Sequence, residues 1–175
     1  LRTVAPKVTG FTSVFARGAA QLLENAELHP TDRTLGLLTH ARLLWGLAGL
    51  DHRDDHLMGL VAQDILKRAP DAKGRDLLAL IDILCAFARL EFKDMKVLEV
   101  AVPRLITLKM QRLRDWDICA LSWALDRLCA KEFFTEFRSL LGSEIAMRGI
   151  PQSQVEQSWL GPESWNPLAQ TRKQQ

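Results

Sequence analysis

Two histidines four residues apart, His52 and His56, lie among three aspartates in the segment from Asp51 to His56. Imidazoles at positions i and i+4 share one face of a helix, where they could bind Zn²⁺ together with a carboxylate such as that of Asp55. The segment, however, falls at the predicted turn between two helices, where acidic residues ordinarily cap the next helix and interact favourably with its dipole. We therefore predict no metal site in this segment.

Residue patterns that support catalysis are missing from the rest of the sequence. Lys73 and Gly74 lack the preceding glycine of a phosphate-binding loop, and there is no Gly-x-Ser-x-Gly motif. His29 and His40 stand alone, so we expect each to lie at the surface or to be partly buried with a satisfied partner. The sequence therefore predicts no enzyme, no cofactor and no small-molecule substrate.

A basic cluster is the stronger chemical signal. The net charge of the whole chain is only +2, but residues 89–114 contain seven basic and three acidic side chains, and residues 104–114 contain no acid. This asymmetry indicates one local contact with an anionic partner, such as RNA phosphates, rather than a protein that coats nucleic acid. The alternative is a solvated helix end whose basic side chains complement the helix dipole. The predicted RNA-contacting residues are Arg104, Lys109, Arg112, Arg114, Arg89, Lys93 and Lys96.

The elements that must position these residues are indicated by an apolar phrase of eight residues that occurs three times. It begins at Leu43, at Ile83 and at Leu121, so the spacings are 40 and 38 residues. Apolar residues within each phrase recur at the three- and four-residue steps of a helix face. A polar break and a second amphipathic run come after each phrase, which predicts a helix, a turn and a second helix. A period in the range of roughly 20–50 residues is typical of a solenoid.

Aligned positions within the phrase make specific packing predictions. The fourth position is always small, which would let a second helix approach closely (Gly46, Ala86 and Ala124). The fifth is always a large apolar residue, which would fill the space between helices (Leu47, Phe87 and Leu125). The third varies widely in volume and should face an adjacent repeat (Trp45, Cys85 and Trp123).

We therefore predict an all-α fold, a right-handed superhelix (α-solenoid) of about three helix-turn-helix repeats of 38–40 residues. The repeats span 34–148 and are divided as 34–73, 74–112 and 113–148. Residues 1–33 should form an extended lead-in and a helix over 11–26, which looks like the second helix of a degenerate earlier repeat.

Local signals mark several boundaries within these repeats. Thr31 or Asp32 is a candidate N-cap for the first helix of repeat one, and Asp115 for the first helix of repeat three. Pro103 should kink the second helix of repeat two near Ala101.

The C-terminal part, residues 149–175, has a different character. It contains three prolines and two glycines but also two large aromatic side chains, so we predict a non-regular tail. Its tryptophans should either dock on the last repeat as a cap or insert into a partner. The predicted partner-binding residues are Trp159, Trp165, Arg172 and Lys173.

Composition limits the compartment. No run approaches the ~18 uninterrupted apolar residues needed to span a bilayer. Three cysteines fit no zinc spacing and fall within predicted helices, so reduced, buried thiols are expected (Cys85, Cys119 and Cys129). The chain starts with Leu1 rather than methionine, and its acid-free start resembles an organellar presequence or the segment directly after one.

The phrase Leu43–Leu50 resembles the LLWALAxL signature of octotricopeptide-type repeats, relatives of the heptatricopeptide and RAP-domain proteins of algal and apicomplexan organelles. The helix lengths, the repeat spacing and the Pro-Arg-Leu at 103–105 are also similar, and the resemblance covers about 34–148. It implies organellar RNA binding, whether in transcript maturation, in translation control or in stabilising ribosomal RNA. The chain departs from the family pattern in having about three repeats, no RAP segment after them and a nearly neutral charge.

Few repeats read few bases, so these departures favour a short array built into a larger ribonucleoprotein. We expect a non-catalytic mitochondrial ribosomal protein that contacts and stabilises rRNA, in the mitochondrial matrix or, alternatively, the plastid stroma. Its partners would be rRNA or other organellar RNA, bound through phosphates, and ribosomal or other complex subunits, with no membrane. The alternative is a protein–protein scaffold or accessory subunit of an organellar complex without RNA contact, which the salt dependence of its retention would distinguish.

Overall fold

The computed structural model describes residues 8–28, 36–129 and 131–157, and within these residues every regular element is a helix. The α-helices are α1 (Val8–Leu28), α2 (Leu37–Gly49), α3 (Asp55–Arg68), α4 (Arg75–Arg89), α5 (Met95–Ile106), α6 (Asp115–Leu128), α7 (Thr135–Met147) and α8 (Gln152–Gln157). Two single turns of 3₁₀ helix, η1 (Ala69–Asp71) and η2 (Met110–Arg112), come after α3 and α5. The all-α prediction is confirmed.

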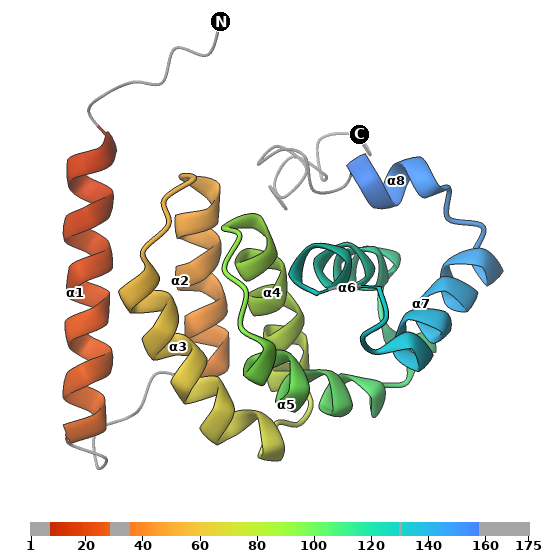
Figure 1. The fold of residues 1–175 in the computed structure, drawn as a ribbon, viewed down its shortest axis with the longest axis horizontal. Helices are drawn as coiled ribbons and strands as arrows, with labels where there is room; N and C mark the ends of the chain where they lie inside the picture. The colour runs from red at the N-terminus through yellow and green to blue at the C-terminus, as the bar shows by residue number, and fades with distance from the viewer. Residues whose placement is uncertain (1–7, 29–35, 130, 158–175) are drawn as a thin grey trace, which may run out of the picture.

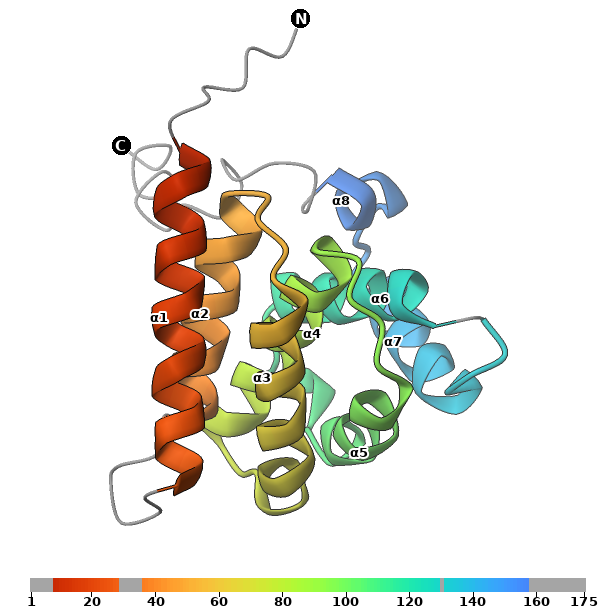
Figure 2. The ribbon, with the colours of Figure 1, turned by 60° about the vertical axis from the view of Figure 1, so that its left-hand side comes forward.

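Consecutive helices form hairpins that pack in two layers. The first hairpin is α2–α3, the second α4–α5 and the third α6–α7. In one layer α4 lies between α2 and α6, and in the other α3 lies between α1 and α5 (Figures 1 and 2). Helix α7 departs from this order, because it packs on α6 and its contact with α5 is at most marginal.

The aligned positions of the repeated phrase show how the first layer is built. The large fifth position is fully or almost fully buried in every hairpin, as predicted (Leu47, Phe87 and Leu125). The third position faces the next hairpin, since the Cys85 Sγ of α4 lies 3.5 Å from the Ala120 carbonyl oxygen of α6. Trp45 is likewise buried, whereas Trp123, on the last helix of the layer, is only half-buried.

The small fourth position behaves differently along the layer. Ala86 and Ala124 are fully buried, on helices that have a preceding neighbour in the layer. Gly46 is exposed, and no atom lies within 4 Å of the point where a Cβ would stand. The close helix approach predicted for this position is therefore wrong at Gly46, because within the described residues no helix precedes α2 in its layer.

The turns of the first two hairpins are copies of each other. Asp51 and Glu91 have left-handed backbones, with φ of 53° and 57°. The amide of the next residue reaches back to Leu47 O at 3.0 Å in one turn and to Phe87 O at 2.9 Å in the other. This pattern satisfies the last carbonyl groups of a helix and lets the chain reverse within a few residues.

Aspartate caps complete both turns. Asp54 accepts a hydrogen bond from the Leu57 amide at 2.9 Å, and Asp94 accepts one from the Val97 amide at 3.2 Å. The first turn of each second helix is thereby satisfied, so α3 and α5 both begin five residues after the end of the apolar phrase.

The third turn is built differently. Cys129 has an extended backbone with φ of −142°, and α7 begins at Thr135 after Phe134, whose φ is 57°. Helix α7 starts two residues later, relative to the phrase, than α3 or α5. The connection between α6 and α7 is thus longer than those in the first two hairpins, and α7 is also the second helix that does not continue the layer of α3 and α5.

Several predicted boundaries need correction. Helix α2 begins at Leu37 with Gly36 as its N-cap, not at Thr31 or Asp32. The N-cap of α6 is Arg114 rather than Asp115, because the extended residue Arg114 donates its amide to Asp117, three residues on.

Three further expectations concern the ends and the kink. Helix α1 is longer than the 11–26 predicted, and the tail predicted as non-regular includes α8. Helix α5 continues through Pro103 to Ile106, and a kink near Ala101 stays a prediction. Within the residues described, no helix is both long and apolar enough to cross a bilayer.

Candidate nucleic-acid interface

The seven predicted RNA-contacting residues divide between the two ends of the second hairpin. Arg89, Lys93 and Lys96 lie around its turn, where α4 ends and α5 begins. Arg104, Lys109, Arg112 and Arg114 lie at the other end, between the last turn of α5 and the start of α6. Helix α5 has 12 residues and is about 18 Å long, so the two groups lie at opposite ends of this helix rather than side by side.

Arg104 joins the second hairpin to the segment that enters it. Its Nη2 donates to the Ala72 carbonyl oxygen at 3.0 Å, while its Nε is buried without a hydrogen-bond partner. The side chain is therefore mainly structural. The contact joins the end of α5 to the segment just before Lys73 and Arg75, two cations that no charge pattern in the sequence grouped with residues 104–114.

Three exposed cations at this end have no internal partner. Lys73, Arg75 and Lys109 are exposed, and within the residues described their side chains form no hydrogen bond or ion pair. Together with Arg114 they make up a surface that we call the basic edge. The exposed acids Asp71 and Asp76 lie close by in sequence, so the edge has a modest rather than an extreme positive charge.

Arg114 is partly neutralised by its own helix. Its Nε and Nη2 donate to the two oxygens of Asp117 at 3.0 and 2.8 Å, although 74% of its side chain is exposed. These hydrogen bonds, opposed by burial, raise the pKa of Arg114 further above its usual value. Asp117 also accepts the Arg114 amide, so the N-terminus of α6 already has its anion.

The remaining predicted cations have simpler surroundings. Lys93 and Lys96 are exposed and Arg89 is half-buried, with no side-chain partner among the described residues. The backbone of Arg112 lies in η2, and its side chain is outside the described part of the structure. The four partner-binding residues predicted in the tail also lie outside the described residues: Trp159, Trp165, Arg172 and Lys173.

Other arginines, which the sequence patterns did not single out, hold neighbouring segments together. Arg53, in the first turn, donates through Nη1 to Glu91 O at 3.0 Å and to Leu90 O at 3.4 Å in the second turn. Arg148, after α7, donates to Met110 O and Leu113 O, each at 2.8 Å, at the entry to α6. They occupy different positions in their hairpins, so no periodic signal in the sequence identifies them.

Arg138 performs the same task inside the third hairpin. Its Nη2 donates to Leu125 O at 2.7 Å and to Cys129 O at 3.2 Å, and its Nε donates to Phe133 O at 2.9 Å. A short ion pair with Asp126 adds to these contacts. The guanidinium thus satisfies carbonyl groups at the end of α6.

The histidine and acid cluster of the first turn does not converge. His52 Nδ1 lies 3.4 Å from Thr12 Oγ1, whereas His56 Nε2 lies 2.9 Å from Glu24 Oε1, so the two imidazoles contact different parts of α1. No group of three or more His, Cys, Asp or Glu side chains suited to a metal ion occurs in the described ranges.

His40 is more buried than expected, with only 1% of its surface exposed. Its Nδ1 donates to Gly36 O at 3.0 Å, and its Nε2 lies 3.6 Å from Asp64 Oδ2. Burial lowers the pKa of His40, against the opposing effects of Asp64 and of the Gly36 carbonyl. His29 lies outside the described residues.

A pair of carboxyl groups lies between α4 and α6. Burial raises the pKa of Asp82 to about 6, and the nearby Asp117 carboxylate adds to this effect while Arg114 opposes it. The thiol of Cys85 is also buried, which raises its pKa well above the usual value. A buried thiol kept protonated is a poor nucleophile, and Cys119 and Cys129 are buried and free as well.

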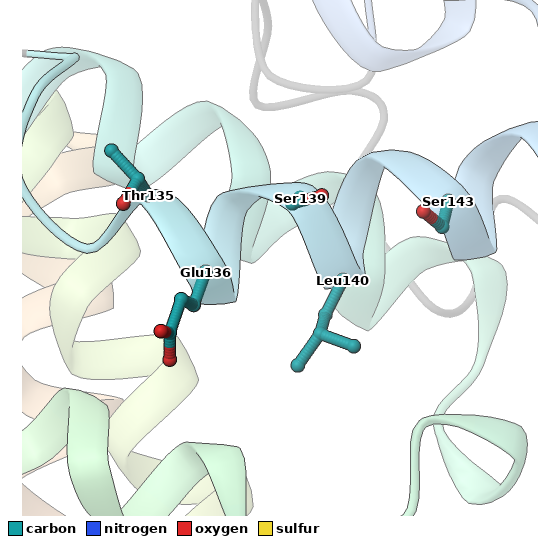
Figure 3. A pocket seen from close by; sticks show the side chains of 5 residues that line it. All are labelled: Thr135, Glu136, Ser139, Leu140 and Ser143. Carbon is teal, nitrogen blue, oxygen red and sulfur yellow. The ribbon is translucent and has the colours of Figure 1, made fainter.

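Helix α7 carries a shallow depression along its outer face. It is lined by Thr135, Glu136, Ser139, Leu140 and Ser143, which recur at helical spacing on that face (Figure 3). The hydroxyl groups there have no adjacent histidine, and the lining carries a single carboxylate. This arrangement offers neither an activated nucleophile nor an acid–base pair.

Comparison of the chain with protein-family models, with curated proteins and with solved structures found no match.

Proposed function

We propose that the protein is a short, non-catalytic α-solenoid of about three repeats that binds RNA phosphates through the basic edge. The two layers of neighbouring helices, and the matching turns of the first two hairpins, support the solenoid description. The family resemblance of the repeated phrase is the reason to place the protein in an organelle. We propose a mitochondrial ribosome as the assembly, with rRNA as the partner.

The observation that carries the proposal is the contact between Arg104 and Ala72 O at 3.0 Å. The start of α4 and the end of α5 share one end of this hairpin, so the exposed cations Lys73, Arg75 and Lys109, which have no internal partner among the described residues, all belong to that end. Exposed ammonium and guanidinium groups bind phosphates without reading the bases. The modest number of such groups suits a protein that braces RNA inside a larger particle better than one that finds a sequence alone.

The test reverses the charge of the basic edge. We expect the triple variant Lys73→Glu, Arg75→Glu and Lys109→Glu to lose at least tenfold in affinity for a single-stranded RNA of about 20 nucleotides, measured by fluorescence anisotropy at about 50 mM salt. Repeating the titration up to about 200 mM salt should also give a shallower salt dependence for the variant than for the wild type, because fewer phosphates are neutralised.

The matched control reverses three cations at the other end of the same hairpin: Arg89→Glu, Lys93→Glu and Lys96→Glu. An equal loss in both variants would reject the basic edge as the site, leaving only a general charge effect. RNA affinity that is unchanged in the first variant would overturn RNA binding at this surface. Incorporation into a native organellar particle that resists high salt would then favour the protein scaffold.

A further inference from the structure

The three hairpins are joined to one another unequally. Between the first and the second hairpin both layers are continuous, because α2 packs on α4 and α3 packs on α5. Between the second and the third only the first layer is continuous. Helix α4 packs on α6, whereas the contact between α5 and α7 is at most marginal (Figures 1 and 2). Within the described residues the third hairpin is therefore held mainly along one helix contact instead of two.

The turns are also tied across the first junction and not across the second. Arg53 donates through Nη1 to Glu91 O at 3.0 Å. Lys93 has the same place in the second turn, three residues after the last leucine of the apolar phrase. It is exposed, and among the described residues its side chain forms no hydrogen bond or ion pair. The carbonyl oxygen that corresponds to Glu91 O in the third turn is that of Cys129, which already accepts from Arg138 at 3.2 Å.

The linkers between the hairpins differ in the same way. The single turn η1, in the first linker, packs on α3, α4 and α5. No described helix packs to this extent on η2, in the second linker. Arg148, after α7, instead donates to Met110 O and Leu113 O at 2.8 Å each, so this linker is tied to the third hairpin. Residues 107–109 are left as the connection between the two bodies.

We propose that the junction between the second and third hairpins is a hinge, at which α6, α7 and α8 move as one body on α4. Helix α8 packs on α6, and Arg138 of α7 donates to Leu125 O of α6 at 2.7 Å, so the three helices move together. Packed helices can slide on each other by small shifts, and a few residues at the end of an element absorb the change in backbone angles.

The basic edge spans this hinge, which gives the motion a consequence for binding. Lys73 and Arg75 lie at the start of α4, whereas Arg114 is the N-cap of α6. The spacing between these cations therefore changes as the third hairpin moves. An RNA that contacts both sides binds best the arrangement whose cations match its phosphates, so it restricts the hinge. This coupling rests on the proposed function, whereas the hinge itself does not.

Distances between spin labels at exposed helix positions test the hinge on the full chain. Glu99 of α5 and Ser139 of α7 lie on either side of the second junction, and Gln63 of α3 and Glu99 on either side of the first. Each pair is replaced by cysteine, labelled and measured by double electron–electron resonance. The distance distribution of Glu99→Cys, Ser139→Cys should be at least about twice as wide as that of Gln63→Cys, Glu99→Cys.

A third pair distinguishes a hinge from loosening of α7 alone. Arg127→Cys, Ser143→Cys spans α6 and α7 within the third hairpin and should give a distribution as narrow as the first junction. Equal widths across the two junctions overturn the hinge. A broad distribution for the third pair also overturns it, because α7 then moves by itself.

Two checks keep these widths interpretable. The three native cysteines are buried, and label uptake by the unmutated chain shows whether they react, in which case alanine replaces them in every pair. Circular dichroism checks that each labelled variant is folded.

Adding RNA of about 20 nucleotides tests the coupling with the Glu99→Cys, Ser139→Cys pair. The distribution should narrow when the RNA is bound. An unchanged width with bound RNA overturns the coupling and leaves the hinge. A chain that binds no RNA rejects the proposed function and the coupling together, while the widths measured without RNA still decide the hinge.

Discussion

At the scale of single residues, Asp82 is a carboxyl group whose surroundings in the folded chain disfavour its ionised form. It lies on α4 beside the buried Asp117 of α6, and burial raises its pKa to about 6. The ionised form is thus less stable in the folded chain than in the unfolded one, where the pKa is near the usual 3.8. Whatever stability Asp82 contributes is fully present below pH 3.8 and is lost as the pH rises through about 6.

Replacing Asp82 with asparagine should remove this penalty. We expect Asp82→Asn to increase the free energy of unfolding by about 1–2 kcal/mol at neutral pH, a value reduced from the full shift because the side chain is partly exposed. Near pH 4 the variant and the wild type should differ little. Urea unfolding at pH 4 and pH 7.5, followed by circular dichroism, measures both differences.

The control for this variant is Glu99→Gln, which removes an exposed carboxylate from the neighbouring helix α5. It should change stability by less than about 0.5 kcal/mol at either pH. A lower stability of Asp82→Asn at neutral pH would mean that the Asp82 carboxylate makes a stabilising contact. The destabilising role that we assign to it between α4 and α6 would then be wrong.

At the scale of elements, the last carbonyl groups of the first helix in each hairpin are hydrogen-bonded in two different ways. The last carbonyl groups of α2 and α4 are satisfied by backbone amides that come after a left-handed residue. At the end of α6 the chain is extended instead, and Arg138 donates to Leu125 O and Cys129 O. A side chain from the second helix has taken over what the backbone does elsewhere.

Because a guanidinium can serve several carbonyl groups at once, lysine should be a poor replacement. We expect Arg138→Lys to lower the free energy of unfolding by about 1–3 kcal/mol, since several partly buried carbonyl groups each lose a charged donor. Arg127→Lys is the matched control, because the exposed Arg127 lies 5.3 Å from the centre of the Trp123 ring and binds no carbonyl group in the described structure. Its effect should be below about 0.5 kcal/mol. Equal costs in urea unfolding would show that Arg138 is not a cap.

How far the sequence predicts the elements depends on whether the signal is periodic. Leu47, Phe87 and Leu125 repeat, and each fills the core as expected. Asp54 and Asp94 were part of predicted polar breaks and do cap their helices. Arg53, Arg104, Arg138 and Arg148 bind carbonyl groups through long side chains, so their partners depend on the packing of helices distant in sequence and no local pattern reveals them.

The candidate site shows the same limit. The charge pattern of residues 89–114 puts Lys93 and Lys109 in one basic cluster, although they lie beyond opposite ends of α5. Conversely, Lys73 and Lys109 are far apart in sequence, but they belong to the same end of the α4–α5 hairpin, where Arg104 binds the Ala72 carbonyl oxygen. Sequence composition finds a surplus of charge, but only the hairpin determines which charges share a surface.

At the scale of the whole molecule, stability is distributed unevenly. Helix α4 lies between α2 and α6 and is buried on most of its surface, with Leu80, Leu84 and Phe87 almost inaccessible. Helix α7 lies at the periphery, packs mainly on α6 and exposes Leu140 and Met147. In an array whose hairpins are supported by their neighbours, the end with fewer contacts opens first.

We therefore expect the amide hydrogens of α7 to exchange at least tenfold faster than those of α4, because local opening at the periphery costs less free energy than opening of the centre. Hydrogen–deuterium exchange followed by mass spectrometry measures this on the wild-type chain. Exchange of α7 as slow as that of α4 would mean that the molecule opens as one unit, contrary to the layered packing.

The side chain of Arg53 determines where further hairpins can be added to this array. It reaches from one hairpin to Leu90 O and Glu91 O of the next, in a turn whose backbone matches its own. Suppose that a copy of residues 34–73 were inserted after residue 73. The original Arg53 could then bind the two matching carbonyl groups in the turn of the copy, and the arginine of the copy could bind Leu90 O and Glu91 O. A copy of 113–148 would contain no arginine in the position of Arg53. Tandem duplication of the first hairpin is thus favoured over duplication of the last.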